Sequence, residues 1–127
     1  MSEIQIDCQL AEIIRSDPRG LRKGHSGEEL TMAYAELFSA AVAERLELLA
    51  KAPVRSVQAD SDDLIVNLLG AAHIEIILRF RPGKAGLKPP ELSARIKAPP
   101  AEIDAAEKLV LSVKDGLLGA PGGAWKA

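Results

Sequence analysis

Residues 54–81 read VRSVQADSDDLIVNLLGAAHIEIILRFR, a stretch in which apolar and polar residues alternate in three short runs. A period of two is typical of a β-strand with one buried face and one face in water. The runs cover 54–59, 63–69 and 73–81, and the breaks between them read Asp-Ser-Asp and Gly-Ala-Ala, which favour turns. The stretch therefore predicts a three-stranded antiparallel meander.

An alternative for the same stretch is one helix over 62–80 that begins at Asp62. Gly70 stands in the middle of this segment, which also holds five β-branched residues, and both features favour strands. Such a helix would also be hydrophobic on nearly all sides. We therefore predict strands and keep the helix as the alternative.

The water-facing side of the meander is not wholly polar. Ile65, Leu69 and Ile77 stand there among polar residues. Large aliphatic side chains on such a face favour partial cover, either by the C-terminal helix or by a second subunit. A symmetric dimer is the simplest source of a second subunit, so we expect self-association.

A long helix is predicted before the meander. Ser26 is followed three residues later by Glu29, the capping-box pattern of a helix start, and Pro53 ends the run. Apolar residues recur at helical spacing between these two points. The predicted buried stripe consists of Leu30, Tyr34, Leu37, Phe38, Ala41, Val42, Leu48 and Leu49.

The two ends of the chain predict shorter elements. Residues 7–16 favour a helix capped by Asp7, after an optional strand at Ile4 and Ile6. A last helix is expected to begin at Ala101 and to end between Gly116 and Gly119.

Between the meander and the last helix, frequent Pro and Gly predict an irregular connector over 82–100, with a short helix over 91–97 as an option. These elements together predict the α+β class: N-terminal helices, a three-stranded antiparallel meander and a C-terminal helix packed on the sheet. We expect one domain over 1–118 and a flexible tail over 119–127.

Composition limits the classes of protein that fit. The chain has 127 residues, of which 47% are hydrophobic, 27% charged and only 3% aromatic. Its single cysteine, Cys8, cannot form an internal disulfide, which favours a reducing compartment. The sequence shows no leader pattern and no apolar stretch near the ~18 residues of a membrane helix, so we expect a cytoplasmic protein.

Charge is uneven although the net charge is only −2. Residues 79–97 hold six bases and one acid, whereas 28–63 hold eight acids and three bases. The basic segment is either a solvated connector or a contact for nucleic acid or an acidic protein. A pI near 5.7 and the scarcity of aromatic residues argue against nucleic acid.

A second basic group precedes the long helix. Arg19, Arg22 and Lys23 stand near a predicted helix N-terminus, where free N–H groups can hold an anion. Glu28 and Glu29 in the first turn would repel such an anion, so an ordinary helix cap is the simpler interpretation.

No motif predicts chemistry. Residues 24–28 read GHSGE, which lacks the final glycine of the hydrolase elbow G-x-S-x-G. Asp60, Asp62 and Asp63 lack the remaining ligands of an EF-hand loop, and His25 and His73 have no ligand partners at zinc spacing. We therefore predict no catalytic residue, no cofactor site and no metal site.

Two families share short segments with this chain. Ser26-Gly27-Glu28, Ala35-Glu36-Leu37 and Val42-Ala43-Glu44, with Ile13-Ile14 before them, resemble the first two helices of small centromere histone-fold proteins. That resemblance implies a helix over 62–80 and DNA binding as a heteromer.

Separately, Ala50-Lys51-Ala52-Pro53-Val54-Arg55 after a long helix, with Lys88-Pro89-Pro90 and a last helix beyond it, is similar in order to phage tail-completion proteins. The chain has Ser56-Val57 where that family has Thr-Gly.

We therefore expect a non-enzymatic binding or assembly protein that acts through protein–protein contacts and self-associates. The alternative is a nucleic-acid-binding module that uses segment 79–97 together with Arg19, Arg22 and Lys23. The residues predicted to bind the partner are Ile65, Ile77, Arg79, Arg81, Lys84 and Lys88.

Overall fold

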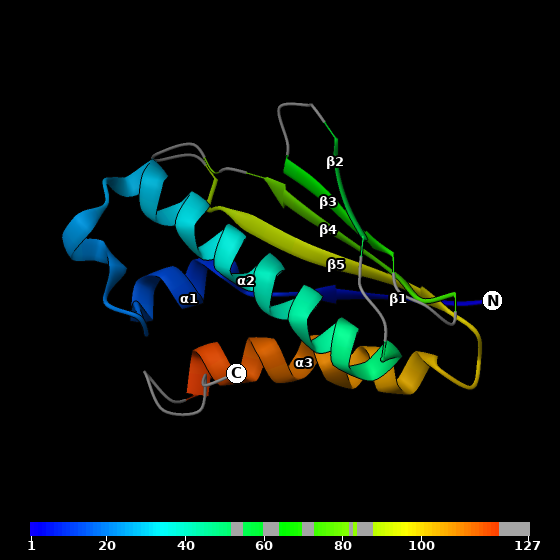
Figure 1. Ribbon diagram of the computed structural model, residues 1–127. Helices are drawn as coiled ribbons and strands as arrows, with labels where there is room; N and C mark the ends of the chain where they lie inside the picture. The colour runs from blue at the N-terminus through cyan, green and yellow to red at the C-terminus, as the bar shows by residue number, and fades with distance from the viewer. Residues whose placement is uncertain (52–54, 60–63, 70–72, 82, 84–87, 120–127) are drawn as a thin grey trace.

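The computed structural model describes residues 1–51, 55–59, 64–69, 73–81, 83 and 88–119. These residues form an α+β structure, as predicted (Figure 1). The elements are β1 (Ser2–Asp7), α1 (Leu10–Ser16), the short 3₁₀ helix η1 (Leu21–Gly24), α2 (Gly27–Ala50), β2 (Arg55–Ala59), β3 (Leu64–Leu69), β4 (Glu75–Arg81), β5 (Glu91–Ala98) and α3 (Ile103–Gly119).

The strands form one antiparallel sheet in the order β1-β5-β4-β3-β2. The predicted meander is confirmed as β2, β3 and β4. The alternative of a helix over 62–80 is wrong, since the described part of that segment consists of β3 and most of β4. The histone-fold resemblance requires this helix, so the structure removes its basis. The two predicted turns of the meander lie outside the described residues.

The sheet is wider than the sequence predicts. The optional strand at Ile4 and Ile6 is confirmed as β1, which pairs with β5. The option of a helix over 91–97 is wrong, and so is the irregular connector over that range, because β5 occupies it. The segment ELSARIKA alternates with a period of two, and both of its edges are paired, one with β1 and the other with β4.

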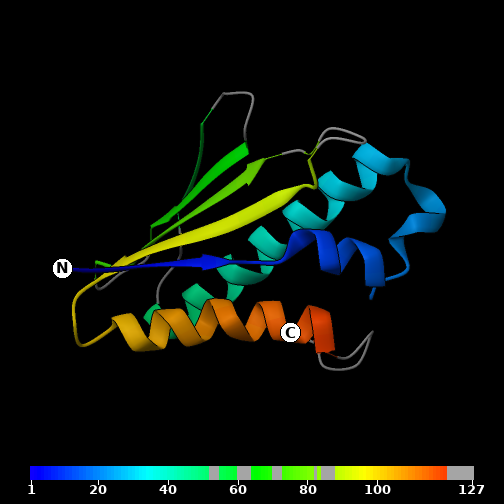
Figure 2. The ribbon, with the colours of Figure 1, turned by 180° about the vertical axis from the view of Figure 1, so that it is seen from behind.

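The helices all lie on one face of the sheet (Figures 1 and 2). Helix α3 contacts β5, β1, α1 and α2, which confirms the predicted packing of the C-terminal helix on the sheet. No helix of the described residues covers the other face. The described residues thus form a helical side, a core, and a sheet face that no described helix covers, which we call the open face. Of the predicted tail over 119–127, Gly119 is the last residue of α3, and the other residues lie outside the described part of the chain.

Helix α2 begins where the sequence predicts, with Ser26 as its N-cap residue. The Ser26 hydroxyl donates to Glu29 Oε1 at 2.8 Å and does not bond the backbone N–H groups. Leu48 and Leu49 were expected in the buried stripe, but they are 73% and 37% exposed. Leu46 takes the core position there, and Leu48 is turned about 200° from it on a helix with 3.6 residues per turn.

Helix α1 is shorter than the predicted 7–16. Asp7 ends β1, and its Oδ1 accepts a hydrogen bond from the Gln9 N–H at 2.9 Å. The helix then begins at Leu10. Asp7 therefore caps the turn between strand and helix, and the helix starts three residues later than the sequence pattern indicates.

The core lies between the sheet and the helices. Every second residue of β5 is buried, and Ile96 is fully buried between its register partners Ile4 and Ile76. Phe38 and Val42 of α2 and Val113 of α3 lie in the same core and are fully buried. Burial of aliphatic and aromatic side chains on this one face is the main source of stability.

We expect Ile96→Ala to lower the free energy of unfolding by about 2–5 kcal/mol, because it leaves a cavity at the centre of the sheet. The neighbouring change Lys97→Ala, on the open face, should lower it by less than about 1 kcal/mol. Urea denaturation followed by circular dichroism measures both values. Equal losses would show that β5 does not alternate between core and solvent.

Candidate functional site

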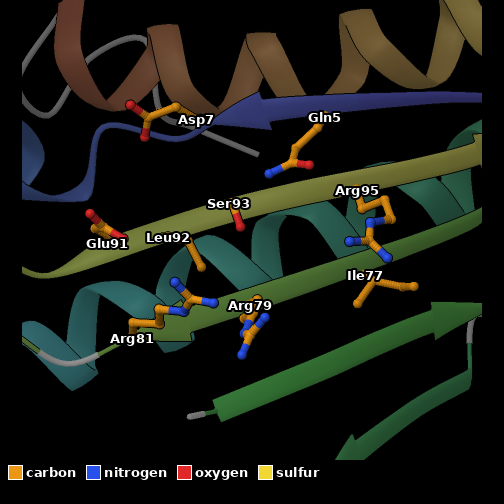
Figure 3. A pocket seen from close by; sticks show the side chains of 9 residues that line it. All are labelled: Gln5, Asp7, Ile77, Arg79, Arg81, Glu91, Leu92, Ser93 and Arg95. Carbon is orange, nitrogen blue, oxygen red and sulfur yellow. The ribbon is translucent and has the colours of Figure 1, made fainter.

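The open face of the sheet is built from every second residue of β1, β5 and β4. Their buried neighbours in sequence point into the core, so strand alternation turns these residues outward. Figure 3 shows this face, with α2 behind the sheet. A groove of about 450 Å³ lies on it, lined by Gln5, Asp7, Ile77, Arg79, Arg81, Glu91, Leu92, Ser93 and Arg95.

The groove collects three arginines from neighbouring strands. Arg79 and Arg81 come from β4, and Arg95 comes from β5, next to the half-buried Ile77 in register. Arg95 Nε lies 3.2 Å from Glu3 Oε1, and both side chains are 51% exposed. An ion pair with that exposure contributes about 0–1 kcal/mol, so it orients the guanidinium more than it stabilises the fold.

Acids on neighbouring strands balance the bases of this face. In register, Glu75 lies opposite Lys97, and Arg81 lies opposite Glu91. Glu3 and Asp7 of β1 add two more carboxylates beside β5. Among the described side chains of β1, β4 and β5, the open face thus carries four bases and four acids. The four bases that 79–97 contributes to these strands are thus matched by four acids, three of which, Glu3, Asp7 and Glu75, lie outside that segment.

The structure brings some of the predicted partner-binding residues together. Ile77, Arg79 and Arg81 share the groove. Ile65 is the register partner of Arg79, but its side chain lies outside the described part of the chain. Lys84 also lies outside the described residues, and Lys88 is exposed ahead of β5. Their role in partner binding stays a prediction.

Sequence reasoning missed the half of the groove that comes from β1 and β5. Gln5 and Asp7 are more than 80 residues from Ser93 and Arg95 in the chain, and only strand pairing makes them neighbours. The alternation in ELSARIKA was a usable signal for Ser93 and Arg95. No local signal in β1 indicates which strand it pairs with.

The loop with Arg19, Arg22 and Lys23 is organised around a carboxylate of its own chain. Asp17 ends α1, and its Oδ1 accepts from the Leu21 N–H at 2.9 Å, while Oδ2 accepts from the Arg22 N–H at 3.2 Å. The Arg22 guanidinium donates to the Ile14 carbonyl at 2.8 Å. The Leu21 and Arg22 N–H groups and one donor of the Arg22 guanidinium are thus used within the loop, and the anion contact predicted for Arg19, Arg22 and Lys23 stays a prediction.

The side chain of Tyr34, on α2, binds this loop through its hydroxyl group. Its hydroxyl donates to Asp17 Oδ1 at 2.5 Å and accepts from the Arg19 N–H at 3.1 Å. The hydrogen bond from Tyr34, followed by those from the backbone, holds the pKa of Asp17 below its usual value. Burial and the same hydrogen bond raise the pKa of Tyr34 to about 12.

The remaining side chains of the types that often carry chemistry are those of Cys8, His25 and His73. Cys8 is fully buried, and burial raises the pKa of its thiol to about 12, which makes it a poor nucleophile. His25 Nδ1 lies 2.8 Å from the Leu21 carbonyl oxygen, and His73 is exposed. Within the described ranges, no group of three or more His, Cys, Asp or Glu side chains is placed to hold a metal ion. None of the described helices has the length and apolar character needed to cross a bilayer.

Comparison with known proteins adds no family: no family model matches the chain, and no curated protein or solved structure gives a significant match. Function must therefore be argued from the geometry of the chain itself.

We expect Asp17→Asn to lower the free energy of unfolding by about 1–3 kcal/mol at neutral pH, because it weakens several hydrogen bonds at once. The folded-state pKa of Asp17 is lowered. Its contribution is therefore present above the unfolded pKa, about 3.9, and is lost as pH falls through the lower folded value.

The difference between the wild type and Asp17→Asn should consequently shrink as the pH drops below about 4. Urea titrations at several pH values measure this difference. Arg15→Gln, on the exposed side of α1, serves as the control. A difference that does not change with pH would contradict the role of the ionised Asp17.

Proposed function

We propose that this protein is a non-enzymatic binding or assembly protein that acts through protein–protein contacts at the open face of the sheet. The carrying observation is the groove that brings three arginines of β4 and β5 together with Ile77, on a face whose described side chains include as many acids as bases. Arginine is enriched at protein interfaces, since its planar group binds carboxylates and its stem covers apolar surface. A fully buried free cysteine fits a reducing compartment such as the cytoplasm.

Charge supports a protein partner over nucleic acid. Binding to phosphates needs a surplus of bases, and the open face has as many acids as bases among its described side chains. Base stacking needs exposed aromatic rings, but the aromatic side chains of the described residues, Tyr34, Phe38 and Phe80, are all buried in the core. The alternative of a nucleic-acid-binding module is therefore the weaker proposal.

The groove also lacks the usual parts of a catalytic site. Among the nine described residues that line it, Ser93 is the only one with a hydroxyl group, and none is a histidine or a cysteine. Nucleophilic catalysis requires a nucleophile beside a base within hydrogen-bonding reach. Binding without chemistry is the function that these side chains support best.

Cross-linking in the cells that produce the protein tests this proposal. Lys97 lies on the open face, whereas Lys108 is exposed on α3, so amine-reactive cross-linkers report both sides of the molecule. We expect links to partner proteins from Lys97 but not from Lys108. The charge-reversed variant Arg79→Glu/Arg81→Glu should lose these links, because repulsion from the neighbouring acids of a docked partner replaces attraction.

Arg15→Glu/Lys108→Glu is the matched control, since it makes the same charge change on the helical side. It should keep the links from Lys97. Partner proteins that link through Lys108, or that remain bound to Arg79→Glu/Arg81→Glu, would contradict a binding site on the open face. Circular dichroism of all variants checks that they fold.

Nucleic-acid binding is tested separately by fluorescence anisotropy with labelled single- and double-stranded oligonucleotides of mixed sequence. We expect no saturable binding even at low salt, because the bases of the face are matched by acids. Affinity that falls steeply with salt and is lost in Arg79→Glu/Arg81→Glu would instead establish the nucleic-acid-binding alternative.

A further inference from the structure

The charges at the two ends of the β4–β5 pair form an alternating pattern. Glu75 lies opposite Lys97 at one end, and Arg81 lies opposite Glu91 at the other. Along each strand, the charge at one end is opposite in sign to the charge at the other end. The four side chains thus mark a rectangle in which every corner has neighbours of opposite sign.

This charge rectangle, formed by Glu75, Arg81, Glu91 and Lys97, is complementary to itself. When two open faces stack about a two-fold axis that runs across the strands, Glu75 of each copy meets Arg81 of the other, and Lys97 meets Glu91. A two-fold axis along the strands, between β4 and β5, instead brings Glu75 onto Lys97 and Arg81 onto Glu91. In both arrangements, each corner of the charge rectangle meets a corner of opposite sign in the second copy.

We propose that the occupant of the open face is a second copy of this chain, which forms a symmetric dimer with the two sheets face to face. This inference rests on the proposed function and names its partner. A surface that binds itself about a two-fold axis must be self-complementary, and most faces with eight charged side chains are not. Here the charges of the described side chains of β1, β4 and β5 sum to zero, and the four corner charges alternate in the required positions.

The middle of the face fits the same arrangement. Between the charged corners lie Ile77 and Arg79 on β4, and Arg95 and Ser93 on β5. About the axis across the strands, Ile77 meets Arg79 of the second copy, and Arg95 meets Ser93. The arginine stems would cover the half-buried Ile77, and the groove of about 450 Å³ gives room for their guanidinium groups between two sheets that pack about 10 Å apart.

Three forms of the protein test the dimer by analytical ultracentrifugation over a wide range of concentrations. The wild type should dimerise. Arg81→Glu/Lys97→Glu makes all four corners negative and should weaken the dimer at least about tenfold, because like charges then face each other under either axis. The full inversion Glu75→Lys/Arg81→Glu/Glu91→Arg/Lys97→Glu keeps every pair within the chain and keeps the pattern self-complementary, so it should dimerise again.

Mixing gives the decisive measurement. The wild type and the full inversion should not form a mixed dimer, because every corner would then meet a like charge under both axes. Native mass spectrometry with an isotope-labelled wild type separates the mixed species from the two pure dimers. Free mixing, or a dimer that is unaffected by Arg81→Glu/Lys97→Glu, would overturn the inference.

A wild type that stays monomeric at all concentrations would also overturn it. The proposed function would survive that result if another protein still cross-links through Lys97. The proposed function would fail together with the proposed dimer if no protein cross-links through Lys97 at all. Far-ultraviolet circular dichroism of the three forms confirms that any loss of association is not a loss of folding.

Discussion

The structure depends on the pairing of β5 along both of its edges. One edge holds β1, which comes from the N-terminus, and the other holds β4, the last strand of the meander. Strand pairing of this kind satisfies the backbone donors and acceptors of a fully enclosed strand. It also fixes the place of α1, because only two residues separate that helix from β1. Without β5, the N-terminal segment would have no site on the meander, and α3 would lose the strands beneath it.

The same pairing creates the open face. The hydrophobic residues of β5 point to the helices, so its polar residues must point the other way. They meet the outward residues of β1 and β4 in register, with Lys97 opposite both Glu3 and Glu75, and Glu91 opposite Arg81. The groove, the balance of charge and the arrangement of the four corner charges are all consequences of one register. A shift by one residue would turn every one of these side chains into the core.

The sequence predicts the local parts of this structure well. Alternation in the run that contains Ile74 and Phe80 is a property of neighbouring residues, and Ser26 and Pro53 mark helix ends directly. The alternation of β5 was equally local, but the prolines and glycines around it favoured a connector. The failure at Leu48 has another origin, because on a helix with 3.6 residues per turn this residue points away from the core position that Leu46 takes.

The site could be predicted only in part, for a physical reason. Ile77, Arg79 and Arg81 belong to a readable strand, and their place on the polar side follows from alternation. The acids that neutralise them come from β1, from the other end of β4 and from β5, and long-range pairing cannot be inferred from one sequence. Net charge counted along the chain therefore overstated the basic character of the surface. Arg19 and Arg22 show the same limit, since the carboxylate of Asp17 organises their loop through contacts with Tyr34.

Because Cys8 is fully buried, the reactivity of its thiol reports on opening of the surrounding core. Cys8 follows β1 directly, its N–H donates to the Leu92 carbonyl of β5 at 2.9 Å, and its side chain has no exposure. A thiol reagent in solution cannot reach the sulfur while the core around Cys8 stays closed. The rate of alkylation at this one atom therefore measures how often that part of the core opens, without any added label.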